Sequence, residues 1–194
     1  RQYEGEKAND PEFAAELAKL GSVYVNEAFS VSHREHASMV LLPKLLPSYA
    51  GLNMMEEVKN LSYVLGKPEQ PYMAIVGGAK LESKRPAIDK LLGLADEVLV
   101  GGRMGLEWVG ELPENLCLPK DYAEGEFDIG PETIDSYKEL IGLSKTILWA
   151  GPMGQFENKD FEAGTRAIAE AIIASRAYSV VGGGDTAKAL TKFG

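Results

Sequence analysis

The 194-residue chain has few of the residues on which several classes of protein depend. Its single cysteine, Cys117, excludes an internal disulfide, and its only two histidines, His33 and His36, are too close together to indicate a structural zinc site. No apolar run approaches the roughly 18 residues that cross a bilayer, and the first residues do not form a signal peptide. We therefore expect a soluble protein of the reducing cytoplasm.

Basic charge is also scarce. The 20 lysines and arginines face 29 acidic side chains, which gives a net charge of −9 and no overall field that attracts nucleic acid or an anionic membrane. An anionic ligand must therefore be held locally. With 45% hydrophobic residues, the chain predicts one globular domain, or one domain with part of another. Because it begins at Arg1 and stops at Gly194 after a helix-like segment, we expect it to be part of a longer protein.

Short apolar runs alternate with segments of helical period over most of the chain. Each run is followed by glycines and then by a helix-like stretch, so the runs predict strands at 72–76, 97–100, 145–149 and 178–181, with a weaker one at 115–118. Parallel strands need crossover connections and covered faces. The pattern therefore predicts an α/β fold with a doubly wound parallel sheet.

The first part of the chain has a different pattern. Asp10 and Pro11 predict the start of a helix that Gly21 ends, a short strand is expected at 23–25, and a stripe of apolar residues predicts a helix over 54–65. We interpret 1–50 as part of a second α/β domain, 51–68 as a connecting helix and 69–194 as the main domain. Periodicity alone equally allows this helix to pack inside one continuous domain.

The turns that follow the four strong strands are rich in glycine. They read GGAK at 77–80, GGRMG at 101–105, GPMG at 151–154 and GGGDT at 182–186. Because the carboxyl ends of parallel strands share an edge, the turns should face one crevice, where this architecture binds ligands. Helices that begin there offer free amide donors to phosphate. The usual P-loop and dinucleotide fingerprints are both absent, so the pattern indicates a nucleotide held in another way.

Several side chains near these turns have a functional and a structural interpretation. Lys80 and Lys84 share a helical face if that helix begins early, and they either meet phosphate or belong to a solvated surface. Asp185 either holds Mg²⁺ or caps a helix, and Thr186 can donate to phosphate. Glu157 either accepts from ribose hydroxyls or complements a helix dipole in its first turn. For Cys117 we favour a buried, inert thiol.

Five motifs in order, VNEAFSVSHREHAS, VGGAKLESK, FDIGPETI, ILWAGPMGQFE and VVGGGDTA, resemble the signatures of phosphoglycerate kinase. The resemblance covers nearly the whole chain. It implies a two-domain, hinge-closing glycolytic enzyme, active as a monomer, that transfers the acyl phosphate of 1,3-bisphosphoglycerate to Mg-ADP, giving 3-phosphoglycerate and ATP. In this family the amino-terminal domain, represented by 1–50, binds phosphoglycerate, and the carboxy-terminal domain, 69–194, binds the nucleotide.

The resemblance also implies roles for individual residues. Phosphoglycerate would be bound by Arg1 and Arg34, whose planar guanidinium groups match phosphate, with help from His33, whereas His36 is better explained as a packed loop residue. Lys80, Lys84 and Gly184 would be catalytic, with Lys80 on the transferred group, and Asp185 would hold Mg²⁺. Glu157 would bind the ribose. The implied nucleotide contacts are Gly78, Ala79, Lys80, Lys84, Gly102, Pro152, Glu157, Gly183, Gly184, Asp185 and Thr186.

The chain departs from the family pattern inside the site. Ser83 replaces an acid, Arg103 a glycine, Ala150 an asparagine and Glu126 a glycine, and the stretch between Trp108 and Phe127 is short. Two alternatives therefore stay open: a noncatalytic nucleotide-binding relative, and a Rossmann-type dehydrogenase, which the lysine pair and the missing fingerprint disfavour. We expect the excerpt alone to be inactive, because the family's first segment, which carries further arginines, and its last segment are absent.

Overall fold

The computed structural model describes residues 2–194 and divides the chain into two compact units, one up to Ser62 and one from Tyr63 to Gly194. The first unit places short helices beside a small parallel sheet of two strands. Its elements are α1 (Glu4–Lys7), α2 (Pro11–Ala18), β1 (Tyr24–Asn26), η1 (Phe29–Val31), α3 (Ala37–Val40), α4 (Leu42–Leu45) and β2 (Ser48–Ala50).

The start of α2 follows the predicted chemistry. Asp10 is its N-cap and accepts a hydrogen bond from the amide of Phe13 at 2.7 Å. The helix ends at Ala18, before the predicted Gly21, because the amide of Lys19 turns back to the carbonyls of the preceding turn. The expected strand lies one residue later than predicted, as β1.

Helix α5 (Leu52–Gly66) contains the predicted helical stretch and crosses the boundary between the two units. In the second unit, the ring of Tyr63 packs edge-on against Tyr178, with 4.8 Å between ring centroids, and its hydroxyl accepts from the amide of Glu69. The last turn of α5 is thereby fixed to the end of the main sheet.

The second unit is built on a five-stranded parallel sheet in the order β5-β4-β3-β6-β7. The strands are β3 (Tyr72–Val76), β4 (Glu97–Val100), β5 (Leu116–Cys117), β6 (Thr146–Ala150) and β7 (Tyr178–Gly182). All five predicted strands are therefore present, with ends shifted by at most one residue. The sheet is parallel throughout, as predicted.

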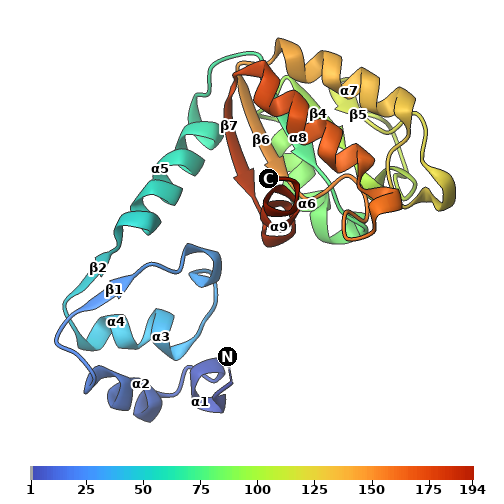
Figure 1. Ribbon diagram of the computed structural model, residues 1–194. Helices are drawn as coiled ribbons and strands as arrows, with labels where there is room; N and C mark the ends of the chain where they lie inside the picture. Colours follow the sequence, from blue (N-terminus) through green and yellow to red (C-terminus); the bar gives the residue numbers. More distant parts are fainter. Residues whose placement is uncertain (1) are drawn as a thin grey trace. The chain divides into compact units, whose positions relative to one another are not determined.

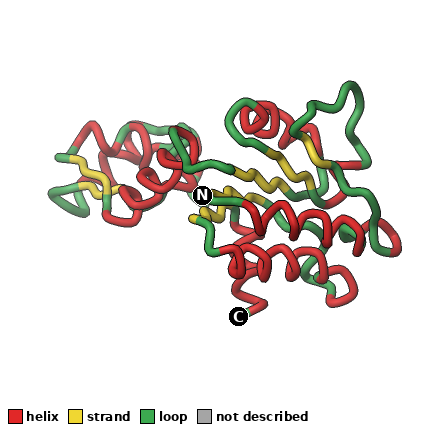
Figure 2. Tube along the Cα trace, turned by 90° about the horizontal axis from the view of Figure 1, so that it is seen from above, coloured by secondary structure: helices red, strands yellow, loops and turns green. Residues whose placement is uncertain are grey.

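Helices cover both faces of this sheet, which confirms the doubly wound α/β fold. The helices are α6 (Leu81–Leu92), α7 (Pro131–Leu143), α8 (Ala163–Ser175) and α9 (Gly184–Phe193), with short 3-10 turns η2 (Gly102–Gly105), η3 (Glu124–Glu126) and η4 (Lys159–Phe161). Helices α7 and α8 lie side by side on one face (Figure 1). Figure 2 shows the strands between helical layers.

The core explains why the strands read as continuous apolar runs. All five residues of β3 are buried, because β3 is central and covered on both faces. On the α7 and α8 face the sheet packs Ile75, Ile147 and Trp149 against Tyr137 and Ile168. Among residues 2–194, no helix is long and apolar enough to cross a membrane.

Candidate functional site

Three of the glycine-rich turns touch one another at the carboxyl edge of the sheet. A Cβ atom on Gly77 would overlap the carbonyl of Pro152, and one on Gly151 would overlap the carbonyl of Gly77. A Cβ on Gly102 would overlap the carbonyl of Gly78, and Gly102 also has a φ of +63°. Only glycine allows these backbones to approach so closely. The turns after β3, β4 and β6 therefore form one continuous surface, as the sequence predicts.

The fourth turn, after β7, is joined to the others through Thr186. This residue is fully buried, and its Oγ1 accepts a hydrogen bond from the amide of Gly151 at 2.7 Å. A threonine that we expected to donate to a ligand phosphate thus connects the start of α9 to the turn after β6. Its hydroxyl fixes the edge on which a ligand would lie, and the side chain does not line the cavity there.

A cavity of about 220 Å³ opens over the joined turns. Six of the predicted nucleotide-binding residues line it, one or more from each turn: Gly78, Ala79, Gly102, Pro152, Glu157 and Asp185. The other five, Lys80, Lys84, Gly183, Gly184 and Thr186, belong to the same turns or helix starts but do not line it. The sequence therefore located the edge of the sheet on which the cavity lies, and the structure shows which of the predicted residues face the cavity.

The two lysines do not share a helical face. Helix α6 begins at Leu81, and Lys80 is its N-cap with an extended backbone, so the early start on which that prediction depended does not occur. Lys80 is exposed, whereas Lys84 is half-buried and its Cε lies 4.0 Å from the position that a Cβ on Gly78 would take. Lys84 thus lies against the first turn, and Lys80 is free of the helix.

The amino end of α6 is less open than expected. The carboxylate of Glu107 accepts a hydrogen bond from the amide of Leu81 at 2.8 Å, so one of the donors predicted to meet phosphate already has a partner. The hydroxyl of Ser83, which stands where the family pattern has an acid, donates to the carbonyl of Lys80. Glu107 was not singled out from the sequence, because its partner is 26 residues away.

The amino end of α9 is open. Its N-cap is Gly183, with a φ of +91°, and no side chain caps the helix. Asp185 lies in the first turn and pairs with Lys188 at 3.0 Å, so our alternative that Asp185 caps the helix is wrong. The free backbone amides and the helix dipole at this end suit phosphate.

Asp185 is the predicted metal ligand. Its side chain is exposed and faces the cavity, and residues 2–194 contain no cluster of three or more His, Cys, Asp or Glu that could hold an ion by itself. Mg²⁺ often takes one or two protein carboxylates and completes its shell with water and nucleotide phosphates. A single carboxylate beside a phosphate site fits an ion that arrives with the nucleotide.

Glu157 lines the cavity from a turn, and not from a helix. It is exposed and lies before both η4 and α8, so the alternative that it complements a helix dipole from a first turn is wrong. Its neighbour Phe156 is buried, and the carbonyl of Phe156 accepts from Lys192. A freely exposed carboxylate at the rim of the cavity is able to accept hydrogen bonds from a ligand's hydroxyl groups.

A buried carboxylate, that of Asp128, contacts the turn that lines the cavity. Asp128 is 1% exposed, and it accepts from the amide of Gly164 at 2.7 Å and from that of Ile129 at 2.9 Å. Burial raises its pKa to about 6, against the lowering effect of these two hydrogen bonds. A Cβ on Gly154, which lines the cavity, would overlap this carboxylate. Asp128 thus fixes the turn after β6 to the start of α8.

Four residues of the cavity wall were not predicted as ligand contacts: Arg103, Phe127, Gly154 and Gln155. The guanidinium of Arg103 lies 3.7 Å from the carboxylate of Glu126, and both side chains are about half-exposed. The sequence shows both residues only as departures from a family pattern. Their contact joins two segments that have no helical or strand periodicity, so the sequence pattern does not predict it.

The predicted phosphoglycerate contacts lie in the first unit. Arg34 is half-buried, and its Nε is buried without a hydrogen-bond partner in the protein, while His33 is exposed. His36 is mostly buried, with its Nδ1 3.6 Å from the carboxylate of Glu6, which agrees with a packed loop histidine. Arg1 lies outside the described residues.

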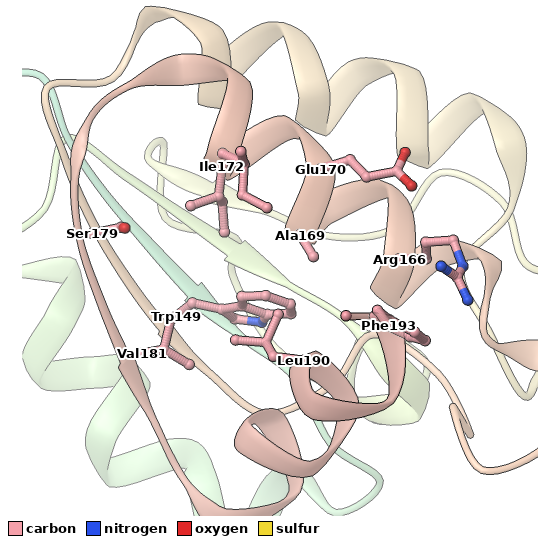
Figure 3. Close-up of a pocket in the computed structure, with 11 residues that line it drawn as sticks. Trp149, Arg166, Ala169, Glu170, Ile172, Ser179, Val181, Leu190 and Phe193 are labelled. Carbon is pink, nitrogen blue, oxygen red and sulfur yellow. The ribbon is translucent and has the colours of Figure 1, made fainter.

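A second cavity, of about 370 Å³, lies between α8, α9 and β7 (Figure 3). Trp149, Ile172, Leu190 and Phe193 give it an apolar wall, and the guanidinium of Arg166 stacks 4.3 Å from the ring centroid of Phe193. Its wall is mainly apolar, so it does not resemble the glycine-lined edge.

Cys117 agrees with an inert thiol. It is half-buried in β5, and burial, together with a hydrogen bond to Glu97, raises its pKa to about 12. Such a thiol is almost entirely protonated at neutral pH.

Comparison with known proteins gives a consistent result. The sequence model of the phosphoglycerate kinase family matches residues 1–110 and 115–194. The phosphoglycerate kinase of Rubrobacter xylanophilus is 39% identical over 240 aligned positions, which cover all of this chain and 61% of that protein. That of Herpetosiphon aurantiacus is 36% identical, over 97% of this chain and 60% of the relative. The chain thus spans about three fifths of these relatives.

The solved structures agree. The phosphoglycerate kinase of Coxiella burnetii superimposes with a TM-score of 0.79 at 32% identity, over 98% of this chain and 62% of that one. The enzyme of Pyrococcus horikoshii gives 0.82 at 26% identity, over 93% and 58%. The family match is interrupted at 111–114, inside the stretch that we expected to be short.

Proposed function

This chain belongs to the phosphoglycerate kinase family, and from that premise we propose that the protein of which it is part transfers a phosphoryl group between 1,3-bisphosphoglycerate and Mg-ADP. The reaction is reversible and gives 3-phosphoglycerate and ATP. The observation that supports this function best is the cavity that residues from four glycine-rich turns line at one edge of the sheet.

The geometry suits a nucleoside diphosphate. The uncapped start of α9 would offer backbone amides to the phosphates, and Asp185, which lines the cavity, would take one coordination position of Mg²⁺. When bound, Mg²⁺ would neutralise phosphate charge. Glu157 would accept from the ribose hydroxyls, and the glycines at 78 and 102 would let the nucleotide lie close to the backbone.

Phosphoryl transfer depends chiefly on in-line positioning and on neutralising charge. Lys80 lies outside α6 with an exposed side chain, and we assign it the role of binding the transferred phosphoryl group. Lys84 lies against the first turn, and its role would be to bind the nucleotide phosphates. Arg34, with its unpartnered Nε, would hold the phosphate of phosphoglycerate. Arg1 and His33 are proposed to assist it. Domain closure would then exclude water and protect the acyl phosphate.

The test is an assay of ATP formation from 1,3-bisphosphoglycerate and Mg-ADP by the full-length protein. We expect activity, and a Lys80→Met variant should lose about 100-fold or more in kcat, since it removes one preorganised charge from the transition state. Lys138→Met, which removes an exposed lysine of α7, is the matched control and should be unchanged.

Two results would contradict the proposal. A Lys80→Met variant with native kcat would remove that lysine from the mechanism. A full-length protein that binds Mg-ADP but forms no ATP would be a noncatalytic relative, the alternative that the departures at Ser83, Arg103 and Ala150 leave open. A cytoplasmic, monomeric protein with no nucleic-acid or membrane partner stays our prediction.

A further inference from the structure

The pair formed by Arg103 and Glu126 places charge at one end of the cavity over the glycine-rich turns. Arg103 lines that cavity, and its guanidinium is 3.7 Å from the carboxylate of Glu126. Neither residue is used by the proposed phosphoryl transfer. A cation half-exposed in a ligand cavity, with its position set by an acid, is available to contact the ligand.

The backbone around Glu126 is unusual. Gly125 has a φ of +76° and Glu126 has a φ of +61°, so two consecutive residues adopt the left-handed conformation. Glycine does this freely, but a glutamate does so only at a cost. This backbone carries the Glu126 carboxylate to Arg103, and the next residue, Phe127, contributes to the cavity wall.

Sheet topology shows which part of a nucleotide would reach this pair. Arg103 follows β4, and the uncapped start of α9 follows β7. In the sheet order β5-β4-β3-β6-β7, three strand-to-strand spacings separate β4 from β7. At about 4.8 Å per spacing, the two ends of the edge lie roughly 14 Å apart. With the phosphates at α9, the base of an extended nucleotide lies toward Arg103.

The walls at this end suit a base. The ring of Phe127 packs against Phe161 with 5.0 Å between centroids, and the carbonyl of Phe127 accepts from the amide of Gln155 at 2.8 Å. Phe127 and Gln155 both line the cavity. A fixed aromatic ring offers an apolar surface on which a planar base can pack.

Because arginine carries hydrogen-bond donors and no acceptor, it binds some bases better than others. A guanidinium has five N–H donors and no acceptor. Guanine presents two adjacent acceptors, O6 and N7, which arginine contacts in a bidentate manner, whereas adenine presents N7 beside an amino group that is itself a donor. The carboxylate of Glu126 lies outside the cavity wall and contacts the guanidinium, so its part is to orient Arg103 toward the base.

We propose that Arg103, held by Glu126, selects the base of the bound nucleotide and favours a 6-oxopurine, such as guanine, over adenine. This inference rests on the proposed function, because it assumes that the glycine-lined edge holds a nucleoside diphosphate. It adds a specificity determinant to that site.

Calorimetric titration of the 194-residue chain with the Mg²⁺ complexes of GDP, IDP and ADP tests the inference. We expect GDP and IDP, which share the 6-oxo group, to bind at least about fivefold more tightly than ADP, the lower end of what one bidentate base contact provides. In Arg103→Gly the preference should disappear. Lys138→Gln, a cation removed from outside the cavity, is the matched control and should keep it.

Arg103→Gln provides a second test that leaves a side chain of similar length. Its amide presents a donor beside an acceptor, the pattern that pairs with N7 and the 6-amino group of adenine, so it should abolish the preference for GDP and shift it toward ADP. Circular dichroism and the melting temperature establish that each variant is folded.

The outcomes distinguish failure of the inference from failure of the proposed function. Native affinity for ADP equal to or above that for GDP would overturn the inference and leave the proposed function intact, and so would a preference for GDP that persists in both Arg103 variants. If a folded chain binds none of the three nucleotides, the proposed function itself fails, and the inference falls with it.

Discussion

Replacing Asp128 with asparagine should change how the stability of the second unit depends on pH. This carboxylate is 1% exposed and accepts hydrogen bonds from the amides of Gly164 and Ile129. Asparagine has nearly the same shape and no titrating group. Asparagine also turns an NH₂ donor toward one of these two amides, a cost that does not vary with pH, so the change of the difference with pH isolates the cost of burying a charge beneath the turn after β6.

The magnitude follows from the pKa. Burial raises the pKa of Asp128 from 3.8 to about 6, so between these values the folded state binds more protons than the unfolded state. Stability from this group therefore falls as the pH rises through that window, by about 3 kcal/mol at most, since one pKa unit is 1.36 kcal/mol. In Asp128→Asn this contribution is absent.

Urea denaturation followed by tryptophan fluorescence measures the effect. Both tryptophans, Trp108 and Trp149, lie in the second unit, so the signal reports on that unit. The free energy of unfolding of the native chain minus that of Asp128→Asn should fall by up to about 3 kcal/mol from pH 4 to pH 7. Asp135→Asn, which removes an exposed carboxyl group from α7, should retain the native profile. Parallel profiles for the native chain and Asp128→Asn would show that Asp128 does not titrate with a raised pKa in the folded protein.

Three further substitutions test hydrogen bonds that hold the second unit together. Thr186→Val leaves the amide of Gly151 unpaired and should cost about 1–3 kcal/mol in urea denaturation, while Thr186→Ser should restore most of it. Tyr137→Phe, which removes a hydroxyl that contacts the carbonyls of both β4 and β5 at 2.8 Å, should cost a similar amount by the same measurement. Burial opposes the ionisation of Asp121, but hydrogen bonds from Thr133 hold its pKa below the ordinary 3.8. Asp121→Asn should therefore lose stability at pH 7, and the difference from the native chain should shrink as the pH falls below about 3.8, measured by pH-dependent denaturation.

Most of the fold of the second unit can be predicted from the sequence. Strands β3 and β4 have the predicted bounds, because a strand buried on both faces reads as an unbroken apolar run that glycine ends. Helix ends that depend on a single backbone hydrogen bond could not be predicted from the sequence. The end of α2 is an example, since the amide of Lys19 closes the helix before Gly21.

The sheet edge that carries the candidate site could be predicted from the sequence, but most contacts between its residues could not. Glycine spacing after parallel strands located the turns, because their placement follows from topology. The contacts of Thr186, Glu107 and Arg103 each join residues that lie far apart in the sequence. Periodicity describes neither such pairs nor the loops that carry them.

Nucleotide binding at the glycine-lined edge is tested by titrating the ¹⁵N-labelled chain with a Mg²⁺-bound nucleoside diphosphate and following amide chemical shifts in NMR spectra. We expect saturable shifts that concentrate at Gly78, Gly102, Gly154 and the start of α9 at 183–186. Shifts confined to the apolar cavity around Trp149, or no saturable shifts in a folded sample, would contradict nucleotide binding at this edge.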